Sequence, residues 1–243
     1  MQETLRAGVA KVEITCREDV ALDALLSEKS KRHLPPFLLG RRLEVSDPLY
    51  ARALVLEDGS ETVVLLTLDV TAIGARTISQ NILCDSADDF LPRLRERIER
   101  ELKIPGGNVS ACASHTHGVP RMLCDDAAQL DRCLAAVAQA LRDRVPVTVA
   151  VGSGREDGLT FNRTMRMKDG TDYTLRSCNP PPQDHEVEGL RPIDPEIGVL
   201  RFDRLDGSPL AVVYNFGTHL LLGPPQGESG RISADHVGVT RNY

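Results

Sequence analysis

Two of the chain's six histidines, His115 and His117, lie two positions apart in the sequence CASHTHG, directly after the short apolar run 109–113. Residues two apart in an extended segment point to the same side, so this spacing predicts that both imidazoles face one direction. Imidazole nitrogens suit zinc, iron, copper and nickel, and the pair therefore favours a metal site. The alternative is that one histidine is buried and hydrogen-bonded while the other faces solvent.

A third histidine, His219, also follows an apolar run, LAVVYNF. Ligands of open α/β sheets gather beyond the carboxyl ends of strands, so two strands that each deliver histidine to that edge favour a shared site. Catalytic zinc normally takes three protein ligands and a water molecule. Asp69, Asp235 or His236 could supply a further ligand, and an Asx turn or a helix cap is the alternative role for Asp235.

The elements that must position these residues alternate between strands and helices. Apolar and alternating runs predict strands over 7–15, 47–59, 61–70, 109–113 and 145–154, a hairpin that turns at Asp169-Gly170, and two final strands around Asp206-Gly207. Leucines and isoleucines at spacings of three and four predict one helix that carries Leu91, Leu94, Ile98 and Leu102, and a second over 126–142. The stretch 179–195 contains five prolines and is expected to be a long loop. The pattern predicts an α/β fold with a mixed β-sheet core flanked by helices.

Composition excludes several classes of protein. The net charge is −6 with acidic and basic residues intermixed, which gives a nucleic-acid partner no electrostatic support. No apolar run reaches the ~18 residues of a transmembrane segment. Residues 1–10 lack the apolar core of a signal peptide, so we expect a cytoplasmic protein, with secretion as the alternative if a leader was removed. The six cysteines have no CxxC spacing, which argues against a cysteine zinc site, and we expect free thiols.

A series of stretches along the chain resembles the neutral/alkaline non-lysosomal ceramidase family, in the N-terminal part of its catalytic domain. The stretches are AGVAKVEIT, DPLYARALVLEDG, VVLLTLDV, NVSACASHTHG, FNR, IGVLRFD, PLAVVYNFGTH and ISADHVG. The resemblance implies zinc-dependent hydrolysis of the amide bond of N-acylsphingosines, and hence a role in sphingolipid metabolism. It also implies zinc ligands at His115 and His219, a place in the active site for His117, and contact between Arg163 and the reacting centre.

The chain also departs from the family pattern. The family reads HTHSGP where this chain has Gly118, so the serine is lost, and Cys16 stands where relatives usually have proline. The sequence ends at Tyr243, before the family's segment with the proposed serine nucleophile. We therefore expect a single ceramidase-like N-terminal domain over 1–243, an incomplete version of a larger catalytic domain with little amidase activity of its own.

Two functions follow from these expectations. The first is a zinc-dependent hydrolase that acts on an amide bond, in N-acylsphingosine or in another amide or ester. The alternative is a non-catalytic metal-binding or interaction domain left by truncation of such a hydrolase. The expected partners are a small-molecule amide or lipid substrate and, through apolar surface exposed by the truncation, a second copy of the chain.

Overall fold

The computed structural model describes residues 4–15, 44–73, 89–118, 126–175, 180–220 and 231–241. The chain divides into two compact units. Unit 1 comprises Met1–Thr148, Asp203–Leu210 and His219–Tyr243, and unit 2 comprises Val149–Phe202 and Ala211–Thr218.

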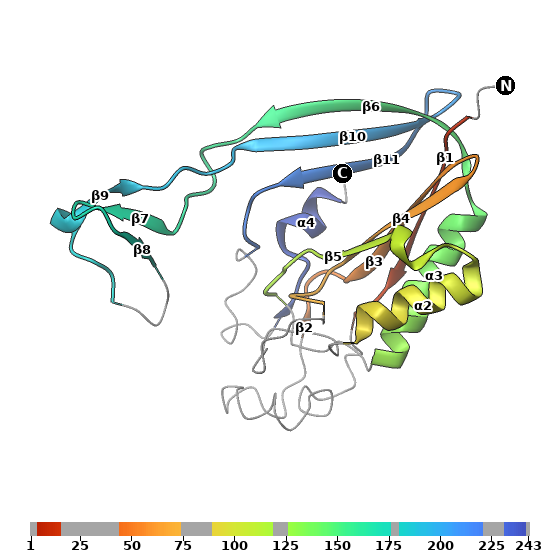
Figure 1. Cartoon of the computed structure of the whole chain (residues 1–243), viewed down its shortest axis with the longest axis horizontal. Helices are drawn as coiled ribbons and strands as arrows, with labels where there is room; N and C mark the ends of the chain where they lie inside the picture. The colour runs from red at the N-terminus through yellow and green to blue at the C-terminus, as the bar shows by residue number, and fades with distance from the viewer. Residues whose placement is uncertain are drawn as a thin grey trace. The chain divides into compact units, whose positions relative to one another are not determined.

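Strands outnumber helices among the described residues (Figure 1). The strands are β1 (Arg6–Glu13), β2 (Glu44–Val45), β3 (Tyr50–Asp58), β4 (Glu61–Leu68), β5 (Val109–Ala113), β6 (Val145–Arg155), β7 (Thr164–Met167), β8 (Asp172–Thr174), β9 (Val187–Leu190), β10 (Glu196–Arg204), β11 (Pro209–Phe216) and β12 (Arg231–Ile232). The helices are α2 (Phe90–Leu102), α3 (Asp126–Arg142) and α4 (Asp235–Thr240), with short 3₁₀ turns η3 (Gly106–Asn108) and η4 (Asp184–Glu186).

Seven strands form one sheet in the order β11-β10-β6-β1-β3-β4-β5, and smaller sheets have the orders β12-β2 and β8-β7-β9. Strand β3 pairs antiparallel with both β1 and β4, whereas β5 pairs parallel with β4. The sheet is therefore mixed, as the sequence predicts. The parallel register places Leu68 opposite Ala113, so β4 and β5 end at the same edge of the sheet. The residues that follow Leu68 and those that follow Ala113 therefore begin at neighbouring positions on this edge.

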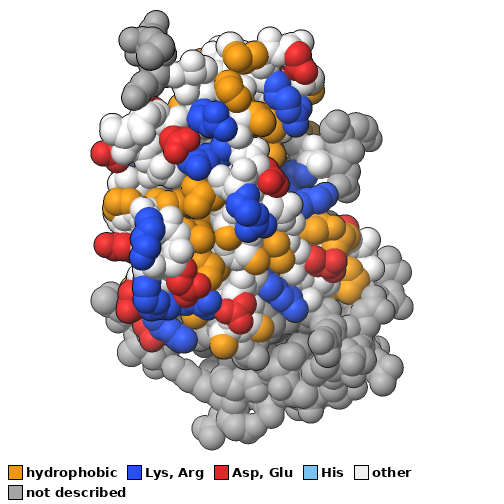
Figure 2. Space-filling model, turned by 90° about the vertical axis from the view of Figure 1, so that its right-hand side faces the viewer, with side chains coloured by type: hydrophobic (Ala, Val, Ile, Leu, Met, Phe, Trp, Pro, Cys, Tyr) orange, Lys and Arg blue, Asp and Glu red, His pale blue; other side chains and the backbone are white. Residues whose placement is uncertain are grey.

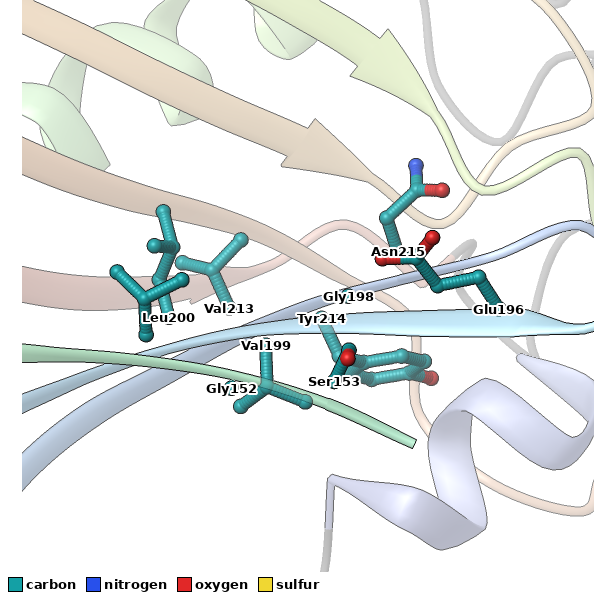
Figure 3. Close-up of a pocket in the computed structure, with 10 residues that line it drawn as sticks. Gly152, Ser153, Glu196, Gly198, Val199, Leu200, Val213, Tyr214 and Asn215 are labelled. Carbon is teal, nitrogen blue, oxygen red and sulfur yellow. The ribbon is translucent and has the colours of Figure 1, made fainter. Parts of the chain in front are cut away.

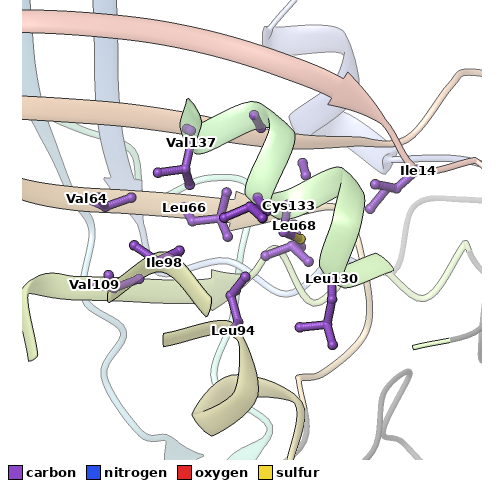
Figure 4. Packing of buried hydrophobic residues seen from close by; sticks show 14 of the residues in the cluster. Ile14, Val64, Leu66, Leu68, Leu94, Ile98, Val109, Leu130, Cys133 and Val137 are labelled. Atoms are coloured by element: carbon purple, nitrogen blue, oxygen red, sulfur yellow. The ribbon is translucent and has the colours of Figure 1, made fainter. Parts of the chain in front are cut away.

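The core of unit 1 lies between the sheet and helices α2 and α3 (Figure 4). Leu66 and Leu68 of β4 point toward Leu94 of α2 and Leu130 of α3, and all four side chains are at most 1% exposed. Each leucine buried in this way contributes about 1.5–3 kcal/mol. Strand β1 runs so close to α3 that a Cβ atom added at Gly8 would lie 1.9 Å from the carbonyl oxygen of Ala140. Glycine is required there because any side chain would clash with the helix backbone.

Most predicted elements are confirmed, within a few residues at their ends. Helix α3 has the predicted bounds, and the final hairpin turns at Gly207, which has a φ of 84°. Two expectations are wrong. Strand β6 is not half-buried throughout: Val147 is 4% exposed but Val151 is 81% exposed. The proline-rich stretch 179–195 is not simply a loop, because it contains η4 and β9, and β9 pairs with β7.

Basic and acidic side chains alternate on the face of the molecule shown in Figure 2, with apolar side chains between them. Arg97 of α2 illustrates the pattern, since it pairs with Glu101 one turn later and with Asp131 of α3. None of the helices among the described residues has the length and apolar character needed to cross a membrane.

Candidate metal centre

Three imidazoles converge in unit 1, those of His115, His117 and His219. The Nε2 atom of His117 lies 3.4 Å from Nε2 of His115 and 3.1 Å from Nε2 of His219. The ring centroids are 4.8 to 5.0 Å apart, and the ligand atoms of all three lie within 4.8 Å of one another. The two sequence motifs therefore meet at one point, as their positions after apolar strands predict.

His115 reaches this point through a backbone turn. Its φ is 64°, a left-handed conformation that histidine adopts more readily than most residues. Its backbone nitrogen donates to the carbonyl oxygen of Val70 at 3.0 Å. The expectation that both imidazoles face one direction is confirmed, but its premise of an extended segment is wrong, because β5 ends at Ala113 and the chain turns at His115. The rings nevertheless converge.

The imidazole of His115 is fixed by the strand beside it. Its Nδ1 lies 2.6 Å from the carbonyl oxygen of Thr71. A carbonyl oxygen can only accept, so Nδ1 carries the proton, and Nε2 is the nitrogen of this ring that lies toward the other histidines. This is the arrangement in which metal-binding histidines are usually held.

The donor set fits a zinc-class ion. Two nitrogens bound to one tetrahedral zinc, each about 2.05 Å from it, lie about 3.3 Å apart. The two separations that involve His117, 3.4 Å to His115 and 3.1 Å to His219, are close to that value, and the three ligand atoms together lie within 4.8 Å of one another. His115 and His117 are partly buried and His219 is exposed, so the cluster is accessible from one side. Imidazole donors in such a setting suit zinc, and also iron, copper or nickel.

Two ceramidases are among the solved structures that match the chain. The crystal structure of neutral ceramidase from Pseudomonas aeruginosa has 20% sequence identity and a TM-score of 0.62, over 98% of this chain and 35% of its own. A ceramidase complexed with C2 has 20% identity and a TM-score of 0.62, over 97% of this chain and 34% of its own. No family model and no curated protein matches the sequence.

The chain has a neutral ceramidase-like fold. It spans about a third of the length of the two ceramidases, which are far longer. The resemblance drawn from sequence motifs and the match of the folds agree, although the motifs cover short stretches and the fold covers nearly the whole chain. The convergence of His115, His117 and His219 is a property of this chain's own structure.

Within the ceramidase-like fold, Asp69 has a structural position. Its side chain is fully buried, and one carboxylate oxygen accepts from the Tyr50 backbone at 3.0 Å and from Arg52 at 2.8 Å. The other oxygen accepts from Arg241. Burial lowers the pKa of Arg52, and Arg241 lowers it further, while Asp69 acts in the opposite direction. Because both oxygens bind arginine, Asp69 is a poor candidate for the further metal ligand.

Asp235 and His236 are not in the histidine group either. Asp235 opens helix α4 with a φ of 61°, and its Oδ1 accepts from the backbone nitrogen of His236 at 2.5 Å. The Nδ1 atom of His236 lies 3.4 Å from the same oxygen. This bond to the next residue is not an Asx turn, which reaches two residues on, and the N-cap of α4 is Ala234. Among the residues described, His117 is the third histidine of the cluster.

Arg163 belongs to unit 2, whereas the histidines belong to unit 1. Its side chain is exposed, and its carbonyl oxygen accepts from the backbone of Leu175 at 2.9 Å. The preceding Asn162 donates to the carbonyl oxygen of Pro192 and accepts from the backbone of Thr164, both at 2.9 Å. Asn162 therefore stabilises a loop, and the role of Arg163 in the reaction stays a prediction.

Unit 2 also carries a groove of about 480 Å³ on strands β6, β10 and β11 (Figure 3). Val151, Val199, Leu200 and Val213 give it apolar walls, and Glu196, Tyr214 and Asn215 lie at the same groove. All its lining residues belong to unit 2, whereas the three clustered histidines belong to unit 1.

Sequence reasoning found the three histidines but missed the groups that hold them. Thr71 acts on His115 through its backbone carbonyl, which leaves no signal in the sequence. Arg52 and Arg241 reach Asp69 from positions 17 and 172 residues away, and only the fold brings them together. Thr116 could have been found from the sequence, because a residue between two histidines that face one side is expected to point the other way. Its side chain is fully buried.

Proposed function

We propose that the chain is the metal-binding part of a zinc-dependent hydrolase of the neutral ceramidase type, acting on an amide bond of N-acylsphingosine or of another amide or ester. The observation that carries the proposal is the convergence of His115, His117 and His219 beside the ends of β4 and β5. The ceramidase-like fold supports it.

His115 and His219 would hold the ion through their Nε2 atoms. A bound zinc-class ion supplies a Lewis acid for a carbonyl oxygen and acidifies a water molecule. The protein holds His115 for this task before the ion arrives, because the Thr71 carbonyl fixes its ring and its tautomer.

His117 would handle protons or donate a hydrogen bond to the substrate carbonyl. Its Nε2 lies 3.1 Å from Nε2 of His219, so it is placed next to one of the two proposed ligand atoms. General acid–base catalysis of this kind contributes about 100- to 10,000-fold. The same nitrogen is also placed to serve as the third metal ligand. A substitution of His117 can therefore distinguish proton handling from metal binding. Arg163 would stabilise the oxyanion of the reaction, a contribution worth about 100- to 1,000-fold.

The proposed substrate is a small-molecule amide or a lipid amide. We further propose that residues 1–243 act as one ceramidase-like domain and that the chain associates with itself through exposed apolar surface. A non-catalytic metal-binding domain is the second candidate function. The activity of the whole enzyme stays a proposal for this chain, because the chain spans only 35% of the Pseudomonas enzyme.

The experiment that tests the proposal measures metal content and amide hydrolysis on the same preparations. Wild type, His115→Ala, His117→Ala, His219→Ala and His185→Ala are loaded with zinc, desalted and analysed for metal. His185 is the matched control, because it lies in η4 of unit 2, outside the cluster. We expect one zinc per wild-type and His185→Ala chain, and less than half that in His115→Ala and His219→Ala.

Hydrolysis is followed as release of fatty acid from a labelled N-acylsphingosine and from shorter N-acyl amines. Zinc-dependent turnover that is lost in His115→Ala supports the hydrolase. Stoichiometric zinc without turnover on any amide or ester supports the second candidate. His117→Ala separates its two roles: retained zinc with lost turnover indicates proton handling, and lost zinc indicates a ligand. Equal zinc content in wild type and all variants would show that the metal site is wrong.

A further inference from the structure

The residue between the two clustered histidines faces the opposite way, into the protein. Thr116 is 0% exposed. Its hydroxyl donates to the carbonyl oxygen of Ser233 at 2.8 Å and accepts from the backbone nitrogen of Gly118 at 3.2 Å. Both bonds are buried. A buried hydroxyl that donates and accepts in this way is costly to replace by an apolar group, because its partners would lose their hydrogen bonds.

The contact with Ser233 joins the histidine loop to a segment more than a hundred residues later in the chain. The backbone nitrogen of Ser233 donates to the carbonyl oxygen of Gly118 at 2.7 Å. Together with the bond from the Thr116 hydroxyl, two hydrogen bonds therefore connect the histidine loop to Ser233. The approach is close: a Cβ atom at Gly118 would lie 2.8 Å from the Ser233 oxygen. We call this pair of contacts, Thr116 and Gly118 with Ser233, the clasp.

The Ser233 end of the clasp is itself held in place. Its hydroxyl donates to a carboxylate oxygen of Asp47 at 2.5 Å, and the other oxygen of Asp47 accepts from the backbone of Ala234 at 2.8 Å. Beyond α4, Arg241 pairs with the buried Asp69. The segment 231–241 is thus anchored to the loop after β2 and to the end of β4. It offers the histidine loop a fixed support.

The other end of the clasp bears on the metal-binding residues. The carbonyl oxygen of Thr116 accepts from the Thr71 hydroxyl at 2.9 Å. Thr71 is also the residue whose carbonyl fixes the ring of His115. Thr71 thus contacts the histidine loop twice, through its hydroxyl to Thr116 and through its carbonyl oxygen to the ring of His115. Thr116 therefore connects the backbone between the two histidines to the residue that orients the His115 imidazole.

We propose that Thr116 is a positioning residue for the histidine cluster: its buried hydroxyl, bonded to Ser233, sets the relative positions of the His115 and His117 imidazoles. The inference rests on the proposed metal site. It adds that the affinity of this site for a metal ion depends on the hydrogen bonds of the buried Thr116 hydroxyl. Loss of comparable supporting contacts costs about 10- to 100-fold in metal affinity.

The test compares Thr116→Val, which keeps the shape but removes the hydroxyl, with Thr116→Ser, which keeps the hydroxyl. Cobalt(II) is the probe, because its visible absorption reports both affinity and coordination. We expect Thr116→Val to bind cobalt about 10- to 100-fold more weakly than wild type and Thr116→Ser to remain within about threefold. Val137→Ala is the control for general destabilisation, since Val137 is buried in α3 among core residues.

The outcomes are distinct. Weaker binding in Thr116→Val alone supports the positioning role. Unchanged binding in Thr116→Val overturns it, and so does an equal loss in Val137→Ala at a matched decrease in Tm, because the effect would then be general stability.

A second readout does not need the metal. Long-range ¹H–¹⁵N spectra of the metal-free protein identify which nitrogen of His115 is protonated. Wild type and Thr116→Ser should show protonated Nδ1, and Thr116→Val a mixture of tautomers. If wild type binds no cobalt, the proposed metal site is wrong, and this spectrum alone decides the positioning role: an unchanged His115 signal in Thr116→Val overturns it.

Discussion

Replacement of Asp69 by asparagine should be the most destabilising conservative change at the sheet edge. Asparagine keeps the size and one oxygen that can accept from Tyr50, but its amide group turns donors toward an arginine. Arg52 and Arg241 then lie in a partly buried site without their counter-charge. The loss of one partner of a buried pair costs about 3–5 kcal/mol. The arginine side chains keep 22% and 18% exposure, so we expect the lower value, about 3 kcal/mol.

The assay is urea denaturation, with thermal unfolding as a second measure. A loss of about 3 kcal/mol lowers Tm by about 6–12 °C in a chain of this size. Asp157→Asn is the matched control, because Asp157 also pairs with an arginine, Arg155, but both side chains are well exposed, at 58% and 70%. Exposed pairs of this kind contribute about 0–1 kcal/mol. If the two substitutions lower the urea midpoint equally, with the same m-value, the reasoning that burial strengthens the Asp69 interaction is wrong.

Four further predictions concern the cluster, the clasp and the cysteines. His219→Ala should weaken cobalt binding by more than about 100-fold, a larger loss than any supporting residue gives, as measured by titration of the visible absorption. Gly118→Ala should lower the free energy of unfolding by about 1–3 kcal/mol because its Cβ would meet the Ser233 oxygen at 2.8 Å, whereas Gly107→Ala, with nothing within 4 Å, should change it little. Thiol titration of the denatured, unreduced protein should count all six cysteines, and a count of two or fewer would contradict free thiols. Burial raises the pKa of the Cys112 thiol, so in the folded protein this thiol should react slowly with iodoacetamide at pH 8, where little of it is thiolate.

The sequence indicates where histidines gather because strand ends are readable from apolar runs. Strands β5 and β11 end within a few residues of the predicted positions, and the histidines placed after them meet at the cluster. The prediction needed only the position of each histidine after a strand. It did not depend on the backbone conformation of each histidine. It therefore holds even though the left-handed conformation of His115 was not predicted.

The features that sequence reasoning missed depend on partners far away in the chain. The valines of 145–154 alternate as in a half-buried strand, but β6 pairs with β1 only at its start, opposite Arg6 and Ala7, and Val149 is 42% exposed. Asp69 looked like a possible ligand because it follows a strand, and only its contact with Arg241, 172 residues later, shows its structural use. Four of the six cysteines, Cys16, Cys84, Cys124 and Cys178, lie outside the described residues, while Cys112 and Cys133 are free thiols. Cys133 is buried as expected, whereas Cys112 is exposed as a residue although its Sγ is partly buried against the carbonyl oxygen of Leu66, at 3.7 Å.

The separation of His117 and His219 by 102 residues has a consequence for how the protein is made. A ribosome that adds about 5–20 residues per second needs roughly 5–20 s to pass from the first histidine to the last. During that time the chain of unit 2 is synthesised, and His115 and His117 are already outside without their partner. If the cluster binds an ion, the complete set of three histidines cannot guide early folding of the nascent chain. All three are available only after the segment that carries His219 has been synthesised and has joined unit 1.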